Sequence, residues 1–154
     1  MTQPMPARES GAARLLRVAA EPVNLAPIRR FVADEAAILG ADPTAVSDLV
    51  QAVDESVTNI IKHGYRGADG IVEVELQAAP GALVVRLRDH APPFDPTVVP
   101  RPDLDLPLER RPPGGMGVHL TRELTDEVRH GSPDGWGNEL TLIKRLESKG
   151  HAGG

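Results

Sequence analysis

Hydrophobic residues recur at two different spacings along the chain, which predicts both helices and strands. Between residues 28 and 40 the apolar side chains lie three or four positions apart and Gly40 follows them, as in a helix packed on one side. A second, longer helix with the same spacing is predicted after ADPT (41–44), and we expect it to end at Gly64. IVEVEL (71–76) and ALVVRLRD (82–89) have strand patterns, with the first alternating at every second residue, and we expect a hairpin-like turn between them.

Further elements are predicted on either side of this central region. Residues 14–20 and 139–146 have strand patterns, and a third helix is predicted from Gly117 with Leu120, Leu124 and Val128 on one face. Together these elements predict an α+β fold, a two-layer sandwich of about three helices on a mainly antiparallel, mixed sheet.

The small, polar residues at both ends set the expected limits of the domain. We expect residues 1–12 to be a flexible N-terminus, residues 13–146 to be a single domain and residues 147–154 to be a flexible tail.

Composition narrows the classes of function. The formal net charge is −5, the aromatic residues are one Trp, one Tyr and two Phe, and no basic run occurs, which argues against direct nucleic-acid binding. There are no cysteines, which excludes disulfides and thiolate metal sites. No segment has the length and apolarity of a membrane span or a signal peptide, so we expect a cytoplasmic protein without membrane contact.

The second predicted helix carries polar side chains at helical spacing. Glu55 and Asn59 are four residues apart and Lys62 follows three later, which places a carboxylate, an amide and an ammonium on one edge. A carboxylate can orient a nucleophile or accept its proton, an amide oxygen can bind Mg²⁺, and an ammonium can contact a phosphate. The same pattern is also typical of the solvated face of an ordinary amphipathic helix.

Asp89 ends a predicted strand and begins the segment RDHAPPFDP. A buried carboxylate there accepts hydrogen bonds only, so it would select the exocyclic amine of adenine over the carbonyl of guanine. Taken alone, an aspartate at this place is more often the first residue of a turn, by roughly two to one.

A proline-rich segment leads into a cluster of glycines. Residues 90–113 contain eight prolines, and PPGGMGVHL (112–120) then opens the third predicted helix. The first N–H groups of a helix have no partners within it and favour a phosphate, although a simple hinge is as consistent with these residues. The stretch matches neither G-x-x-x-x-G-K-[ST] nor G-x-G-x-x-G after a strand.

Taken in order, these motifs resemble a known family. AVDESVTNIIKHGY, the RDHAPPFDP block and GGMGVHLTRELTDEV followed by GNELTLIKRL are similar to the Bergerat-fold, histidine-kinase-like ATP-binding domains. More specifically, they resemble the bacterial anti-sigma factor serine/threonine kinases, over about residues 14–146.

The resemblance implies ATP and Mg²⁺ as cofactors. It makes Glu55 the residue that polarises the attacking hydroxyl and Asn59 the Mg²⁺ ligand, with residues 95–113 as a mobile lid. The implied ATP-binding residues are Asn59, Lys62, Asp89, Ala91, Gly115, Met116, Gly117, Val118 and, through water, Thr141.

The implied function is phosphorylation of an anti-anti-sigma (STAS-type) partner combined with sequestration of a sigma factor by a homodimer. Position 91 departs from the family pattern. The family has the motif Asp-x-Gly, whereas this chain has Asp89-His90-Ala91. The added methyl is harmless if residue 91 has a negative φ, but could otherwise crowd the base. The alternative is therefore an ATP-binding regulatory module that binds a protein partner without kinase activity.

Overall fold

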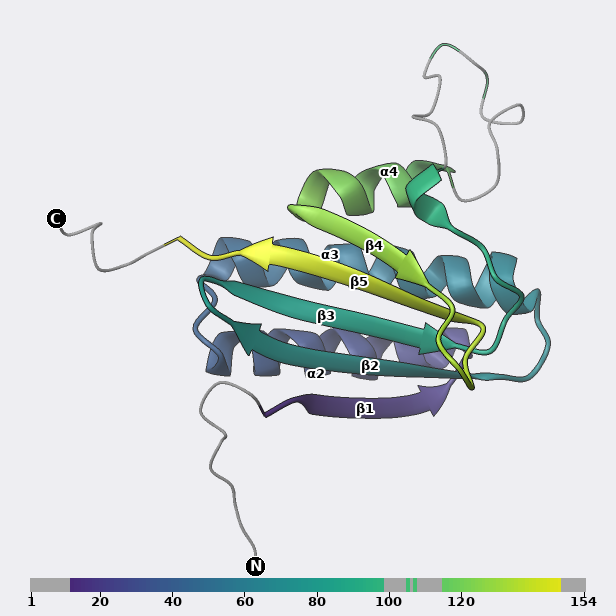
Figure 1. Cartoon of the computed structure of the whole chain (residues 1–154), viewed down its shortest axis with the longest axis horizontal. Coiled ribbons are helices and arrows are strands. Elements are labelled where there is room, and N and C mark those ends of the chain that lie inside the picture. Colours follow the sequence, from purple (N-terminus) through teal and green to yellow (C-terminus); the bar gives the residue numbers. More distant parts are fainter. Residues whose placement is uncertain (1–11, 99–104, 106, 108–114, 148–154) are drawn as a thin grey trace, which may run out of the picture.

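The computed structural model describes residues 12–98, 105, 107 and 115–147, and in Figure 1 they form one sheet with helices packed behind it. The helices are α2 (Leu25–Ile38), α3 (Pro43–Asn59) and α4 (Gly115–Leu124). The strands are β1 (Arg14–Ala19), β2 (Ile71–Ala79), β3 (Ala82–Asp89), β4 (Glu127–Gly131) and β5 (Asn138–Arg145).

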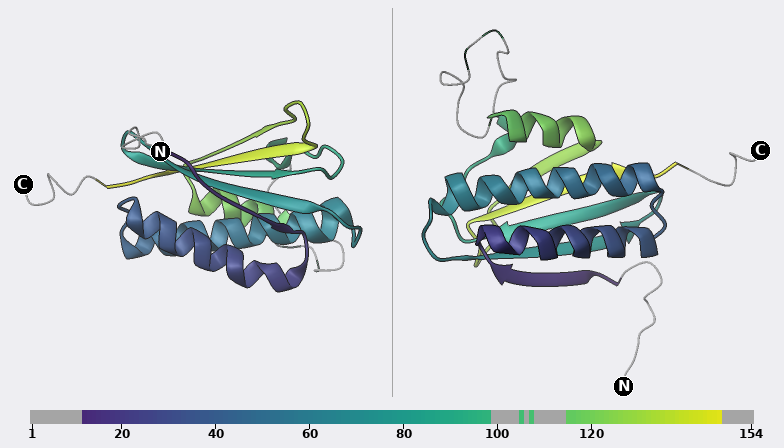
Figure 2. Two further views of the ribbon diagram at one scale, coloured as in Figure 1. Left: turned by 90° about the horizontal axis from the view of Figure 1, so that it is seen from below. Right: turned by 180° about the vertical axis from the view of Figure 1, so that it is seen from behind.

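The sheet has the strand order β1-β2-β3-β5-β4. Its four pairings are all antiparallel, so the mixed character that we expected is not present among the described strands. Figure 2 shows α2, α3 and α4 on one face of this sheet, and the opposite face has no helix from the described residues over it. The predicted α+β two-layer sandwich is confirmed.

The core lies between the two layers and follows the predicted spacings. Strand residues that alternate along β2, β3 and β5 face one side of α2 and α3, because neighbouring residues of a strand point to opposite faces. The fully buried large side chains are Ile28, Val32, Leu49, Val53, Val57, Val72, Val74, Leu76, Leu83, Val85, Leu87 and Leu142.

Local signals start and extend α3. Asp42 caps its N-terminus, where the Asp42 side chain accepts a hydrogen bond from Ala45 N at 2.8 Å, and proline occupies the first turn. The helical backbone does not end at Gly64 as predicted. α3 ends at Asn59, and a π-helical turn (Ile60–Tyr65) continues from it. That turn ends at Arg66, whose φ of 55° places a bulky residue in the left-handed region.

The third predicted helix is wrong at its C-terminal end. α4 begins at Gly115, two residues before the predicted start, and ends at Leu124, where Thr125 Oγ1 donates to the carbonyl of Thr121 at 2.8 Å. Val128 belongs instead to β4, a five-residue edge strand that the sequence patterns did not reveal. Val128 follows Leu124 by four residues, so the helical spacing of apolar residues continues into this short strand.

Charged residues cover the open face of the sheet. Arg88 is paired with three carboxylates, those of Glu73, Glu75 and Glu139, at 2.7 to 2.9 Å. Arg17 contacts Glu73 from the neighbouring strand at 2.6 Å. Burial by itself raises the pKa of Glu73, but the hydrogen bonds and charges of Arg17 and Arg88 outweigh it and hold that pKa below its usual value.

Candidate functional site

A cavity of about 1190 Å³ is lined by residues near the end of α3 and by residues of α4. In Figure 1, the end of α3 and the start of α4 lie at the same end of the sandwich. The cavity wall comes from the π-helical turn, the segment after β3, α4 and the ends of β4 and β5. Ser56 Oγ and Thr121 Oγ1 lie 3.3 Å apart and join α3 to α4 within this wall. The cavity volume is somewhat larger than the range of about 300–1,000 Å³ that is usual for small-molecule sites, so the cavity has room for a nucleotide.

Asp89, the last residue of β3, lines this cavity and is 2% exposed. Its Oδ1 accepts hydrogen bonds from Asn138 Nδ2 and from Ala91 N, both at 2.9 Å. Its Oδ2 receives no hydrogen bond from the described residues. Oδ2 is also not fully enclosed by protein, because it is not among the buried side-chain atoms that lack a partner. Burial raises the pKa of Asp89, and the hydrogen bonds from Asn138 and Ala91 oppose that rise. The arrangement leaves one acceptor oxygen for a ligand.

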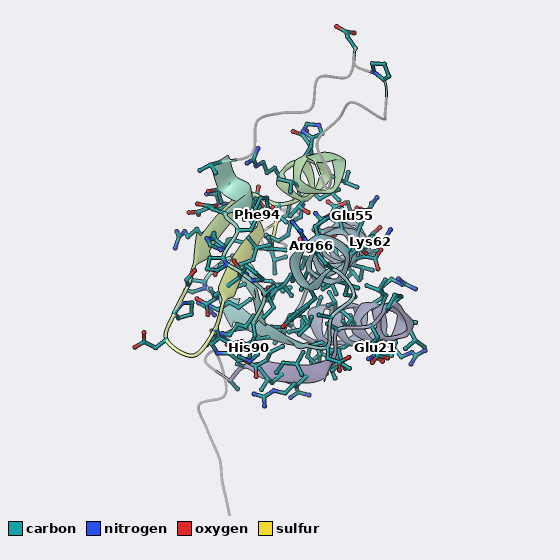
Figure 3. The ribbon with its side chains drawn as sticks, turned by 90° about the vertical axis from the view of Figure 1, so that its right-hand side faces the viewer. Glu21, Glu55, Lys62, Arg66, His90 and Phe94 are labelled. Atoms are coloured by element: carbon teal, nitrogen blue, oxygen red, sulfur yellow. The ribbon has the colours of Figure 1, made fainter. Side chains whose placement is uncertain are left out.

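The predicted helix residues also gather at this end of the molecule. Asn59 and Lys62 line the cavity, and Glu55 lies one helical turn before Asn59, outside the lining. In Figure 3, Glu55 and Lys62 are labelled close together beside the end of α3. Within the described part of the chain, none of these three side chains has a hydrogen bond or ion pair. Three polar groups are therefore available to a ligand or substrate.

Lys62 lies in the π-helical turn rather than in a regular α-helix, and π-helical turns often occur at functional sites. Arg66 follows that turn and also lines the cavity, with no ion pair or hydrogen bond from the described residues. Figure 3 shows Arg66 between Phe94 and the end of α3. Lys62 and Arg66 provide unneutralised positive charge at the cavity, which favours an anion.

The backbone conformation and surroundings of Ala91 show how its methyl group is accommodated in place of the family's glycine. Its φ is not positive, because Arg66 is the one non-glycine residue with positive φ in the described ranges. Ala91 is 3% exposed and its methyl points toward Gly64: a Cβ added at Gly64 would lie 3.0 Å from the Cβ of Ala91. The methyl therefore fills space left by a glycine, and the backbone N–H of residue 91 still reaches Asp89.

The glycine-rich segment is described only in part. Gly115, Met116 and Gly117 form the first turn of α4, at the cavity end of the molecule, and Val118 is buried and lines the cavity. The side-chain surroundings of residues 115–117, and the predicted lid and hinge over residues 99–104, 106 and 108–114, lie outside the described structure. Phosphate binding by Gly115 and Gly117 stays a prediction.

Thr141 is not brought to the cavity. Leu140 and Leu142 face the helices and are buried, so Thr141 between them points to the open face of the sheet, opposite Arg86 and Arg129. Our assignment of Thr141 to the nucleotide is therefore wrong. Asn138, three residues earlier at the start of β5, occupies the place beside Asp89 instead.

Several cavity residues were missed from the sequence: Tyr65, His130 and Asn138. The Tyr65 hydroxyl donates to the Ile71 carbonyl at 2.8 Å and accepts from His90 N at 2.7 Å. Alternation back from Leu142 and Leu140 would have placed Asn138 on the helix-facing side. No sequence signal singled out Tyr65 or His130.

Metal ligands are few at this site. The described residues hold no group of three histidine or acidic side chains that could bind a metal by themselves. A Mg²⁺ ion bound together with a nucleotide needs fewer protein ligands, because phosphate oxygens and water complete its coordination. The free amide oxygen of Asn59 fits that requirement.

The described part of the chain contains no helix that is long and apolar enough to span a bilayer.

Comparison with known proteins agrees with this geometry. Residues 18–144 match the family described as the histidine kinase-like ATPase domain. A Clostridium botulinum protein named anti-sigma F factor is 36% identical over 125 residues, which cover 75% of this chain and 82% of that protein. A Bacillus thuringiensis protein named serine-protein kinase RsbW is 25% identical over 118 residues, 74% of each chain.

A solved structure shares the fold. The crystal structure of the RsbU and RsbW domains of a Mycobacterium tuberculosis protein superposes with a TM-score of 0.60 at 22% identity and covers 88% of this chain. This chain spans about a third of that longer protein, 32% of its length.

Fold, cavity and family match define a histidine kinase-like ATPase domain, which implies that the chain binds ATP. Within that class, the relatives at 25 and 36% identity are a serine-protein kinase and an anti-sigma factor. The chain belongs to the anti-sigma factor serine/threonine kinase family.

Proposed function

We propose that this protein is an ATP-dependent serine/threonine kinase that phosphorylates an anti-anti-sigma partner of STAS type and also sequesters a sigma factor. The observation that carries the proposal is the unpartnered Glu55 carboxylate, which lies outside the cavity lining, one helical turn before the lining residue Asn59. A group at that place remains accessible to a hydroxyl presented by another protein. A protein that only bound ATP would have no evident use for it.

Each cavity group has a role in this reaction. Asp89 binds the adenine amine through its free oxygen, and Lys62 neutralises phosphate charge. The amide oxygen of Asn59 would hold a Mg²⁺ ion, which would supply further charge neutralisation at the phosphates. Glu55 orients the incoming serine or threonine hydroxyl and takes its proton, while the hydroxyl oxygen bonds to the γ-phosphorus, the bond to the β,γ-bridging oxygen breaks and ADP leaves. Phosphoryl transfer depends mainly on such positioning, so little other protein chemistry is required.

Partner switching follows from the product of this reaction. A phosphate on the anti-anti-sigma partner adds about two negative charges and can disrupt a fitted interface, which would free the kinase for the sigma factor. The homodimer remains part of the proposal on the strength of the family resemblance.

The decisive experiment separates transfer from binding. The purified chain, Mg²⁺ and ATP labelled at the γ-phosphate are mixed with a cognate anti-anti-sigma protein, and wild type is compared with Glu55→Gln. We expect transfer to fall by about 10²- to 10⁴-fold, the usual contribution of a positioned acid–base group, while ATP affinity measured by calorimetry stays nearly unchanged.

The control is Gln51→Ala, an exposed position of α3 one turn before Glu55. This variant should transfer phosphate at the wild-type rate. If wild type binds both ATP and the partner but transfers no phosphate, the alternative of a regulatory module without kinase activity is correct. If Glu55→Gln instead transfers phosphate at the wild-type rate, Glu55 has no part in the reaction.

A further inference from the structure

Among the described residues around Asp89 in the cavity wall, Asn138 is the polar residue with the most hydrogen bonds. It is 8% exposed, and its Nδ2 donates to Asp89 Oδ1 at 2.9 Å and to the carbonyls of Ala91 and Pro92 at 3.2 Å each. Two amide hydrogens serve three acceptors, so at least two of these acceptors share one hydrogen. Asn138 thus contacts both the carboxylate and the segment that follows it.

The partners of Asn138 define its orientation and that of a histidine. Phe94 N donates to Asn138 Oδ1 at 2.8 Å, and a backbone N–H can only donate, so the amide oxygen is on that side. His130 Nε2 lies 2.7 Å from the same oxygen. His130 must therefore donate from Nε2, which requires the Nε2–H tautomer or the charged ring.

The hairpin between β4 and β5 adds backbone and ring contacts to the same segment. Gly137 N donates to the Asp89 carbonyl at 2.7 Å, and a Cβ at Gly137 would lie 1.9 Å from the Ala91 carbonyl, so only glycine permits this approach. The rings of His90 and Trp136 stack with centroids 4.5 Å apart and planes 5° apart. The segment after Asp89 is therefore held by the hairpin on one side.

We propose that Asn138 and His130 are positioning residues that aim the free oxygen of Asp89 and so determine selectivity for a 6-aminopurine nucleotide. This inference rests on the proposed nucleotide site. Asn138 and Ala91 N both bind Oδ1, which prevents rotation of the carboxylate and leaves Oδ2 toward the cavity. His130 acts through Asn138: its Nε2–H donates to Asn138 Oδ1 and so opposes a flip of the Asn138 amide group.

Selectivity is the property that this arrangement controls. Adenine presents an amine at C6, which an acceptor oxygen binds, whereas hypoxanthine in ITP presents a carbonyl at the same place. A carboxylate aimed at C6 thus favours ATP and repels ITP. Without Asn138, the Asp89 carboxylate can turn or take up water, and its contribution to the choice between these bases is lost.

The test measures the affinity of the full chain for ATP and for ITP by calorimetry. In Asn138→Ala we expect ATP affinity to fall about tenfold, the equivalent of one hydrogen bond to a charged group, with ITP affinity changed less than about twofold. His130→Leu should lower the ATP-to-ITP ratio by a smaller factor, and His130→Gln should restore it, because glutamine still donates. Arg129→Gln, on the opposite face of β4, is the matched control and should leave the ratio unchanged.

The outcomes separate this inference from the proposed kinase. Equal losses for ATP and ITP in Asn138→Ala and in His130→Leu would overturn it, because a merely structural role lowers both affinities alike. If Asn138→Ala does not fold, the two His130 variants carry the same test. Wild type without preference for ATP over ITP would also overturn it. Selective ATP binding that depends on Asn138, without phosphate transfer, would support it and remove only the kinase activity.

Discussion

The contact between Gly64 and Ala91 allows a quantitative test of how this chain accommodates the residue that departs from the family pattern. A Cβ added by Gly64→Ala would lie 3.0 Å from the Cβ of Ala91, whereas carbon atoms pack best at about 3.5–4.0 Å. Both residues are in the cavity wall, and Ala91 is 3% exposed, so neither side can move aside freely. Overpacking of this kind costs about 1–3 kcal/mol.

A double-mutant cycle isolates that cost. Replacing glycine by alanine within a helical turn by itself stabilises by about 1 kcal/mol, and Ala91→Gly removes a buried methyl worth about 0.8 kcal/mol. These separate effects cancel in the cycle of wild type, Gly64→Ala, Ala91→Gly and the double variant. The remaining coupling energy should be about 1–3 kcal/mol, with Gly64→Ala tolerated better when residue 91 is glycine.

The measurement is urea unfolding of the four proteins at one pH, with equal m-values as the check on two-state behaviour. Calorimetric ATP titration of Ala91→Gly accompanies it, and we expect unchanged affinity within about threefold because the methyl faces Gly64. Coupling below about 0.5 kcal/mol would refute the packing argument. A large gain in ATP affinity would mean that the Ala91 methyl crowds the base after all.

Three further predictions concern single side chains. Asp89→Asn turns the free acceptor into a donor, so calorimetry should show preference shifted from ATP toward ITP by about 5- to 150-fold, the equivalent of 1–3 kcal/mol; an unchanged preference would contradict the base assignment. Glu73→Gln should lower the free energy of unfolding at pH 7 by about 1–3 kcal/mol. Because Arg17 and Arg88 hold the folded-state pKa of Glu73 below its usual value, that stabilisation is present above the unfolded pKa and is lost as pH falls through the folded one. The difference from wild type should therefore close on acidification, and a constant difference from pH 7 to pH 3 would be inconsistent with the ion pairs. Thr141→Val, on the open face, should leave ATP affinity unchanged within about twofold, and a tenfold loss would return Thr141 to the site.

Much of the fold was determined by local patterns in the sequence. Period-two and helical spacings located four strands and three helices, because burial of one face leaves a direct record in the order of apolar residues. The short edge strand β4 was missed, since five residues with Val128 in phase with the preceding helix carry no distinct period. The end of α3 was misplaced because a π-helical turn and the left-handed Arg66 have no simple signal.

The candidate site divides in the same way. Asn59, Lys62 and Asp89 were predicted from the residue types and spacing of ordered motifs, and the structure brings them to one cavity. Alternation along β5 separates Asn138 from Thr141 by face, but the tertiary structure alone decided that Asn138 stands beside Asp89, because the residue opposite depends on the register between β3 and β5.

Contacts between segments distant in sequence were likewise decided only by the folded structure. Asn138 reaches Asp89 across 49 positions, and the methyl of Ala91 faces Gly64 across 27. A local pattern reports which side of its own element is buried, but it holds no information on which residue of another element lies opposite. The sequence by itself thus determined the class of site, and the tertiary structure decided which side chains orient it.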